Sequence, residues 1–328
     1  MEIPCVRVPR EQGEAVRSSL AEADIIHEDY EIEATDDWLY IPVTTTKHLP
    51  DTYEIVRRTP RKRSQQVLPG DILGYSPRYE RLGDIALIDE GDTERAQEIA
   101  DALVASDIPV SSVLNRQSKI SGRYRVRDWA LLAGDSTETL HREFGVKFRV
   151  DVTETYFSPR LATERNRVID QVSPDERVID MFAGVGPFII PMACRGADVV
   201  GVDINDVAID YLEANAALND VSERVTAIHG DVREIGETYA GWADRLIMNL
   251  PHSAQEFLPT AKRLASDRCR LHYYDIQHED APFAPGKSAI REVFDDEYAI
   301  SVEDERIVRS YAPHEVNVCL DIDVHTLE

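Results

Sequence analysis

The spacing of apolar and polar positions changes repeatedly along the chain, and these changes predict its elements. The clearest segment runs from Arg177 to Asn205. A short apolar strand ends at Asp180, a tight glycine loop and an apolar helix follow, and a second apolar strand ends at Asp203. This order of strand, helix and strand predicts a βαβ unit with its loop at the carboxyl end of the first strand.

The alternation of strands and helices continues to the C-terminus. It predicts a strand at 150–157 and a helix at 161–171, which lead into a doubly wound sheet. Within that sheet we expect strands at 178–180, 199–203, 225–229, 245–249 and 270–274, helices at 188–195, 207–219, 255–264 and 287–293, and late strands at 299–308 and 316–324.

Two smaller units precede this sheet. The first, residues 1–67, has a helical pattern at 11–23 and strand patterns at 30–33 and 38–43. The second, residues 68–150, has strand patterns at 83–88, 110–114 and 124–132, a helix at 93–105, and mixed strand and turn at 138–148. The predicted fold class is α/β, a doubly wound Rossmann-like domain at 151–328 with two smaller N-terminal α+β domains.

Composition changes the interpretation of charge. The 328 residues carry a net charge of −25, and the pI is about 4.7. Such a chain repels itself unless salt screens it, so the composition predicts a salt-rich cytoplasm, as in a halophilic archaeon. A merely acidic mesophilic protein is the alternative. Against this background a basic run at 57–63, RRTPRKR, is a candidate contact for phosphates or a solvated linker.

Cysteine spacing and hydropathy exclude other classes. Cys5, Cys194, Cys269 and Cys319 form no C-x-x-C pair, so we expect neither a zinc site nor a disulfide framework, and no metal. The N-terminus has no signal-peptide pattern, and no apolar stretch is long enough to span a membrane. We therefore expect a cytoplasmic protein that does not bind membranes.

The glycine loop Phe182–Phe188, FAGVGPF, selects the class of cofactor. Gly184 and Gly186 let the backbone come close to a ligand, but the third glycine of a dinucleotide loop is missing. Pro187-Phe188 stand where a pyrophosphate would need free N–H groups. S-adenosylmethionine, a nucleoside without phosphates, fits better. The pattern resembles motifs I and II of class I S-adenosylmethionine-dependent methyltransferases, while an ordinary crossover is the alternative.

Polar residues at successive strand ends extend this site. Asp203 is placed for ribose hydroxyls and Asp231 for the adenine amino group, although each acid alone could be a helix N-cap. Asn249-Leu250-Pro251 resembles motif IV of enzymes that methylate planar base nitrogens. Glu164 and Arg165, on the expected exposed face of a helix, could remove a proton and stabilise negative charge. An intrahelical ion pair is the alternative.

Six segments in the same order make the resemblance specific. They are FSPRLATER at 157–165, DMFAGVGPF at 180–188, GDVRE at 230–234, MNLP at 248–251, HYY at 272–274 and RSYAP at 309–313. Over roughly 70–325 the chain resembles the archaeal and eukaryotic tRNA (guanine-N1)-methyltransferases that modify guanosine 37, beside the anticodon. The first unit matches that family loosely in sequence, but in size and place it is similar to the family's first domain.

The resemblance implies roles for individual residues. Glu164 would be the general base for guanine N1–H, Arg125 would stabilise charge on O6, and Asn249 would hold the guanine. Pro251 would shape the pocket, and Arg165 would either be structural or steer substrate. The implied cofactor site comprises Arg160, Phe182, Gly184, Gly186, Asp203, Asp231 and Asn249.

The expected partner is tRNA, bound by a monomer, with the first unit reaching a distant part of the tRNA. Two alternatives stay open. One is a wyosine-pathway enzyme that transfers an aminocarboxypropyl group or methylates a wyosine intermediate. The other is a non-catalytic RNA-binding protein with a vestigial cofactor fold.

Overall fold

The computed structural model describes residues 2–47, 49–50, 52–63, 66–118, 127–294 and 297–327. The chain divides into two compact units, Met1–Val67 and Leu68–Glu328.

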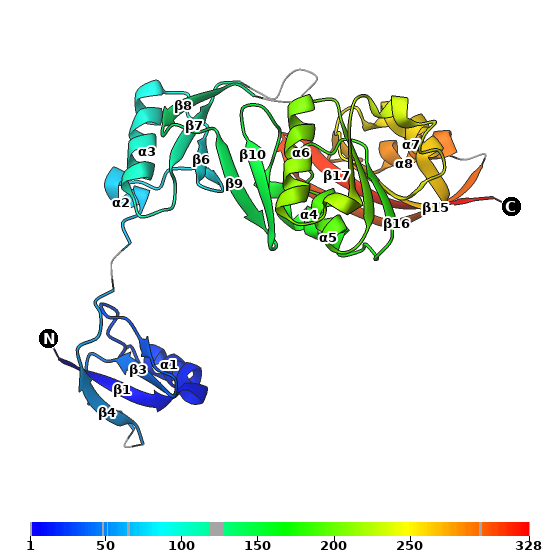
Figure 1. The fold of residues 1–328 in the computed structure, drawn as a ribbon. Coiled ribbons are helices and arrows are strands. Elements are labelled where there is room, and N and C mark those ends of the chain that lie inside the picture. The colour runs from blue at the N-terminus through cyan, green and yellow to red at the C-terminus, as the bar shows by residue number, and fades with distance from the viewer. Residues whose placement is uncertain are drawn as a thin grey trace. The chain divides into compact units, whose positions relative to one another are not determined.

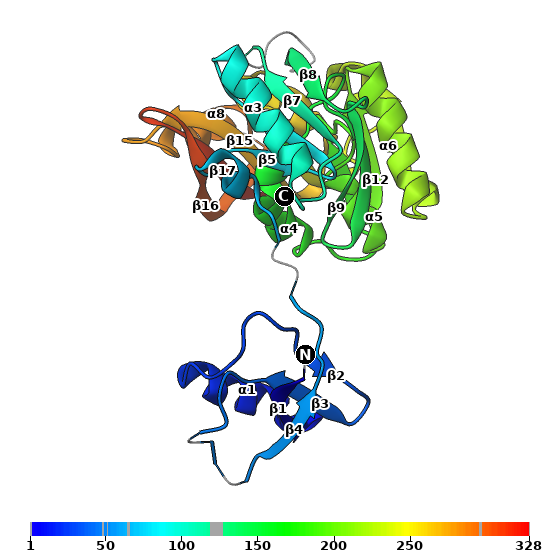
Figure 2. The same cartoon turned by 90° about the vertical axis from the view of Figure 1, so that its left-hand side faces the viewer.

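The first unit is a four-stranded antiparallel sheet with one helix against it (Figure 2). Its elements are β1 (Ile3–Pro9), α1 (Gly13–Glu22), β2 (Glu33–Ala34), β3 (Trp38–Pro42) and β4 (Glu54–Arg58), in the sheet order β2-β3-β1-β4. Val16 and Leu20 of α1 pack on Val6 and Ile41 of the sheet, as the helical spacing of four residues requires. The predicted helix and the strand at 38–43 are confirmed.

The strand predicted at 30–33 is wrong, because the observed strand begins later in the chain. The strand β2 begins only at Glu33, and Tyr30 makes a single bridge to Lys62. The chain turns at His27 instead, where the Tyr30 N–H donates to the His27 carbonyl at 3.2 Å.

The first part of the second unit is a four-stranded sheet in the order β5-β6-β7-β8. Its elements are α2 (Pro69–Leu73), β5 (Glu80–Leu82), β6 (Ile85–Ile88), α3 (Thr93–Ala105), β7 (Ser112–Arg116) and β8 (Trp129–Ala133). The helix α3 has the predicted bounds, because Asp92 caps it by accepting from the Arg95 N–H at 3.0 Å. The predicted strand at 124–132 begins outside the described residues, which omit 119–126.

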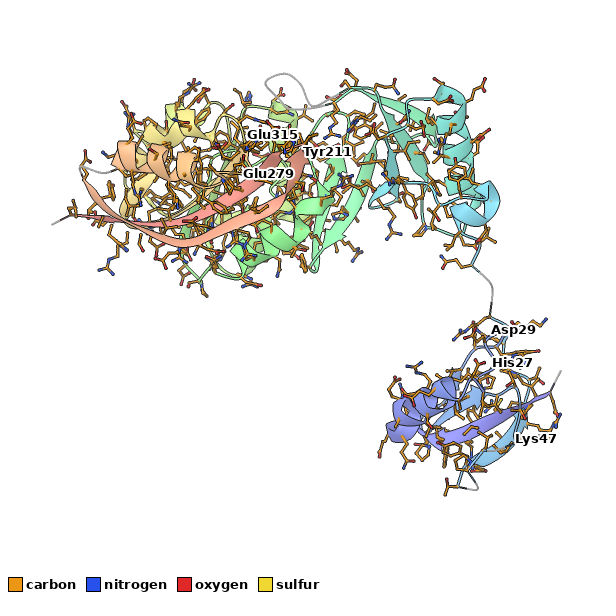
Figure 3. The ribbon with its side chains drawn as sticks, turned by 180° about the vertical axis from the view of Figure 1, so that it is seen from behind. His27, Asp29, Lys47, Tyr211, Glu279 and Glu315 are labelled. Atoms are coloured by element: carbon orange, nitrogen blue, oxygen red, sulfur yellow. The ribbon has the colours of Figure 1, made fainter. Side chains whose placement is uncertain are left out.

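A hairpin of β9 (Glu138–Glu143) and β10 (Val146–Asp151) joins this sheet to the last part of the chain (Figure 1). The helix α6 (Asp206–Leu218) completes its edge with side chains. Asn215 accepts from the Arg149 N–H at 2.7 Å and donates to the Arg149 carbonyl at 3.1 Å. The hydroxyl of Tyr211, labelled in Figure 3, donates to Glu138 at 2.6 Å. The backbone groups of this edge therefore have partners that no strand supplies.

The strand predicted at 150–157 is wrong, because β10 ends at Asp151. The Asp151 carboxylate accepts from the N–H and the hydroxyl of Thr153 at 2.8 and 2.6 Å, and its carbonyl accepts from the Thr155 N–H at 3.0 Å. These local bonds compete with strand pairing and close a turn. Val150 and Val152 of this segment are buried in a hydrophobic core, and Phe157 packs against the same core.

A seven-stranded sheet forms the rest, in the order β13-β12-β11-β14-β15-β17-β16. All neighbours are parallel except β17, which runs antiparallel to both β15 and β16. The strands are β11 (Arg177–Asp180), β12 (Asp198–Asp203), β13 (Val225–His229), β14 (Ala243–Met248), β15 (Ala265–His278), β16 (Tyr298–Ala312) and β17 (Glu315–Thr326). The remaining helices are α4 (Ala162–Ile169), α5 (Ile189–Cys194), α7 (Leu258–Leu264) and α8 (Ala284–Phe294).

Helices cover both faces of this sheet (Figure 1). Because successive side chains of a strand point to opposite faces, Val178 packs among α4, α5 and α6, whereas Ile179 packs among α7 and α8. The near-continuous apolar strands are those of a sheet buried on both sides. The predicted fold class, a doubly wound Rossmann-like domain with smaller N-terminal domains, is confirmed.

The strand order places the ligand site. The chain moves outward from β11 through β12 to β13, then returns to β14 on the other side of β11. The carboxyl ends of β11 and β14 therefore flank the point where the order reverses, and open α/β sheets bind ligands there. Among the described residues, no helix is long and apolar enough to cross a membrane.

Candidate active site

A cavity of about 210 Å³ opens at the carboxyl ends of the central strands. It brings together residues that lie far apart in the sequence. Of the predicted site residues, Arg165, Phe182, Gly184, Asp203, Asp231, Asn249 and Pro251 line it.

The glycine loop forms one wall of the cavity. Gly184 has a φ of 53°, and its N–H donates to the Asp203 carboxylate at 2.7 Å. A Cβ built on Gly184 would meet nothing closer than the Tyr156 carbonyl at 3.8 Å, so the loop leaves room for a ligand. Gly186 serves packing instead, because a Cβ there would lie 2.5 Å from the Leu212 side chain. Gly186 is not among the residues that line the cavity.

The three acids at the strand ends have different surroundings. Asp180 is buried, and its carboxylate accepts from the Phe182 N–H at 3.1 Å; burial raises the pKa of Asp180 to about 7. Burial also raises the pKa of Asp203, which accepts from the N–H groups of Gly184 and Asn205. Asp231 accepts from the Arg233 N–H at 3.0 Å. Asp231 thus caps a helical turn and also faces the cavity, so the N-cap alternative describes part of its role.

Aromatic rings and the end of β14 complete the cavity. Phe182 meets Phe257 edge to face, with ring centroids 4.9 Å apart. Asn249 and Pro251 follow β14 directly and reach the cavity from the other side of the strand-order reversal. Planar side chains and the Asn249 amide are suited to a flat, partly polar ligand.

The expectation that Glu164 and Arg165 lie on an exposed helix face is wrong. They are 7% and 2% exposed. Arg165 lines the cavity, and its guanidinium donates to both carboxylate oxygens of Glu143 at 2.8 and 2.6 Å. It also donates to the Ser158 carbonyl at 3.0 Å and lies 4.9 Å from the Phe157 ring. Arg165 therefore fixes the segment that enters α4.

Glu164 belongs to a buried polar network. Its carboxylate accepts from Arg167 at 2.7 and 3.0 Å and from the Tyr274 hydroxyl at 2.9 Å. Glu164 is not among the residues that line the cavity. The ion pair with Arg167 is intrahelical, as the alternative interpretation of this segment expected.

The network continues through Asp321 and His272. Arg167 donates to Asp321 at 2.5 Å, and the Nδ1 of His272 lies 2.7 Å from the same carboxylate. The Nε2 of His272 faces the Arg245 guanidinium at 2.6 Å, so it accepts and Nδ1 carries the proton. These bonds hold the pKa of Asp321 well below its usual range, although burial opposes them. His272, Cys319 and Asp321 are close enough to ligate a metal, but the two arginines already occupy them.

Arg160, another predicted site residue, does not line this cavity. Arg160 is exposed, pairs with Glu80 at 3.0 Å and lines a neighbouring cavity. Arg125 falls within 119–126, outside the described residues. Arg127, which follows closely, is described and also lines the neighbouring cavity.

Sequence reasoning missed Arg309 and Asn317 as site residues. They lie opposite each other on β16 and β17 and line the cavity. The Arg309 Nε and the Asn317 Oδ1 are buried without hydrogen-bond partners among the described residues. The RSYAP segment marked Arg309 as part of a motif, but only the register of the two strands places it beside Asn317.

Three family descriptions match successive parts of the chain. The TRM5/TYW2 methyltransferase domain matches residues 139–300, the tRNA methyltransferase 5 N-terminal domain matches 5–47, and the TYW2 N-terminal domain matches 64–137.

Relatives match over nearly the full length. The tRNA (guanine(37)-N(1))-methyltransferase Trm5b of Pyrococcus abyssi is 39% identical over 97% of this chain and 98% of its own. Its crystal structure aligns with a TM-score of 0.72 and 38% identity over 98% of this chain and 99% of that one.

Two further relatives bear on the substrate. A complex structure of aTrm5 and tRNALeu aligns with a TM-score of 0.71 and 31% identity, covering 97% and 99% of the two chains. The tRNA(Phe) (4-demethylwyosine(37)-C(7)) aminocarboxypropyltransferase of Pyrococcus horikoshii is 34% identical over 78% of this chain and 93% of its own. The motifs, the strand order and these matches agree, and the chain belongs to the TRM5/TYW2 methyltransferase family.

Proposed function

We propose that this protein is a tRNA methyltransferase that transfers a methyl group from S-adenosylmethionine to N1 of guanosine 37. One observation carries the proposal. The cavity joins the glycine loop and Asp203, which suit a nucleoside donor, to Asn249-Leu250-Pro251, which suits a planar base. The near full-length similarity to a tRNA (guanine(37)-N(1))-methyltransferase supports the same reaction.

The cofactor site we propose uses residues that line one cavity. Asp203 would take the ribose hydroxyls with oxygen lone pairs that Gly184 and Asn205 leave free, and Asp231 would take the adenine amino group. Phe182 would lie against the adenine. S-adenosylmethionine supplies an electrophilic methyl group, and the chain's own residues hold the acceptor in line with it.

The acceptor nitrogen must lose its proton before it attacks. Glu164 is the proposed general base, supported by its place on α4 beside Arg165, which lines the cavity. Arg167 and Tyr274 both donate to its carboxylate. To act, the carboxylate must leave one of them and turn toward the cavity. The O6 stabiliser, predicted as Arg125, stays a prediction, as does substrate steering by Arg165.

We also propose functions for the whole chain. The unit 1–67 would contact a distant part of the tRNA, residues 68–150 would form an RNA-binding middle domain, and 151–328 would carry the methyl transfer. The protein would act as a monomer in a salt-rich cytoplasm, and its composition is the support for that environment.

The competing function is a wyosine-pathway activity, and the similarity to an aminocarboxypropyltransferase favours it. Two labelled donors separate the functions. With tRNA and S-adenosylmethionine labelled in either the methyl or the aminocarboxypropyl group, we expect only the methyl label in RNA. Transfer of the aminocarboxypropyl label would reverse the assignment.

A further inference from the structure

A second cavity adjoins the active-site cavity. It lies between the sheet of β6 and β7, the segment before α4, and β16. Tyr156, Phe157, Ser158 and Arg309 line both cavities. A group bound in one cavity therefore lies close to a group bound in the other.

Four arginines from separate elements line this second cavity, which we name the arginine cleft. They are Arg116 of β7, Arg127, Arg160 and Arg309 of β16. Asp89 pairs with Arg116 at 2.5 Å, and Glu80 pairs with Arg160 at 3.0 Å. Four arginines less two carboxylates leave a local charge of +2 in a chain whose net charge is −25. This local excess of cations is opposite in sign to the net charge of the chain.

Polar atoms of the cleft lack partners. The Arg309 Nε and the Glu80 Oε1 are buried and make no hydrogen bond within the described part of the chain. Burial lowers the pKa of Arg127, and the nearby charges of Arg116 and Arg160 lower it further, against Tyr156 and Glu80. Desolvated cations that repel one another are costly without an anion between them.

The chemistry of the anion follows from the site beside it. Guanidinium groups are planar forks that match phosphate oxygens, and S-adenosylmethionine carries no phosphate. A nucleotide whose base enters the active-site cavity brings a phosphodiester on each side of its ribose. We propose that the arginine cleft binds a phosphodiester adjoining the target nucleotide. This inference rests on the proposed function, and it assigns Arg160 to RNA rather than to the cofactor.

Such a contact would have a defined use. A base that reacts in a closed cavity must leave its stack, and a grip on its own backbone holds it out. Phosphate contacts fix register without reading sequence, so the cleft would position the nucleotide while Asn249 and its neighbours read the base.

The test combines neutral linkages with arginine variants. Full-length protein is titrated with tRNA that carries one uncharged methylphosphonate immediately 5′ or 3′ of guanosine 37, or all natural linkages. The proteins are the wild type, Arg160→Gln, Arg116→Gln and the control Arg195→Gln. Arg195 pairs with Asp170 at the end of α5, away from both cavities. Affinity for S-adenosylmethionine is measured for each protein.

We expect one neutral linkage and each cleft variant to weaken tRNA binding about tenfold. When a cleft variant binds tRNA that carries the neutral linkage, the loss of tRNA affinity should be no greater than with the variant or the linkage alone. In the control Arg195→Gln, the neutral linkage should weaken tRNA binding as much as it does in the wild type. Additive losses at both linkages in both cleft variants would overturn the proposal. If the cleft variants instead lose affinity for S-adenosylmethionine, the arginine cleft binds the carboxylate of the cofactor, and the proposal is wrong. Wild-type activity on natural tRNA, assayed in parallel, separates these results from failure of the proposed function.

Discussion

Glu164 shows how far a residue's surroundings can depart from its local sequence. Its neighbours on α4 are polar, yet Glu164 is buried. Its carboxylate accepts from Tyr274, and Arg167 links it to Asp321. Tyr274 and Asp321 lie more than 100 residues away, and helical periodicity carries no information about them. By contrast, Asp203, Asp231 and Asn249 were predictable, because the ends of parallel strands meet at one edge of a sheet.

The general-base assignment predicts the behaviour of Glu164→Gln. Methyl transfer should fall by about 10²- to 10⁴-fold, because the amide cannot take the guanine proton, while S-adenosylmethionine binding persists. Single-turnover rates and cofactor titration measure the two effects. Glu213→Gln, on the exposed side of α6, is the matched control. A Glu164→Gln protein that is folded and fully active would disprove the role.

The raised pKa of Asp180 predicts how the stability of the protein depends on pH. Its pKa is raised to about 7 by burial, whereas an unfolded aspartate titrates near about 3.9. Unfolding therefore releases a proton between about pH 4 and 7, and this group's contribution to stability is lost as the pH rises through that window. Asp180→Asn keeps the oxygen that accepts from Phe182 and removes the titration.

The stability of Asp180→Asn relative to the wild type should rise between about pH 4 and 7 and then level off. Urea midpoints at several pH values measure it, with the exposed Asp210→Asn as control. A difference that is constant across that window would show that Asp180 ionises normally in the folded protein.

At the scale of elements, regular alternation and caps were the reliable signals. The helix α3 and the central strands follow from them. The strand predicted at 150–157 failed because Asp151 makes a turn with its own neighbours. The attachment of β10 to α6 through Asn215 was beyond sequence reasoning, because an asparagine gives no sign of which distant backbone it will meet.

The two loop glycines should respond differently to a methyl group. Gly186→Ala meets both a φ of 88° and the Leu212 side chain at 2.5 Å, and should destabilise the fold by about 2–4 kcal/mol. Gly184→Ala meets only a φ of 53° in open space and should cost about 1 kcal/mol. Denaturant midpoints compare the two directly. A Gly184→Ala protein that is the less stable of the pair would contradict the packing role of Gly186.

For the whole molecule, the net charge predicts how stability depends on salt. The net charge of the chain is −25, so its negative groups repel one another. This repulsion should weaken as the Debye length falls from about 10 Å at 0.1 M salt to about 3 Å at 1 M salt. We expect the Tm to rise by several degrees between these KCl concentrations, and less in sucrose of equal osmolality. A Tm that stays constant or falls would argue for an ordinary acidic protein.

The basic run is better defined in the structure than in the sequence. Arg57 and Arg58 belong to β4, while the Arg61 carbonyl and the Arg63 N–H bond to Glu31 and Asp29. Replacing Arg61, Lys62 and Arg63 by serine should weaken tRNA binding several-fold and leave cofactor binding unchanged. The control variant replaces Arg10 and Arg17 of the same unit by serine, and its tRNA affinity is compared with that of the first variant. An unchanged tRNA affinity would make the run a structural connection only.

The central claim is the identity of the methylated atom. Transcripts of one tRNA with G or A at position 37 are incubated with the protein and S-adenosylmethionine in high salt, then digested for nucleoside mass spectrometry. We expect 1-methylguanosine from the G37 transcript and no methylated nucleoside from the A37 transcript. A methyl group on another atom or another position, or equal methylation of both transcripts, would contradict it.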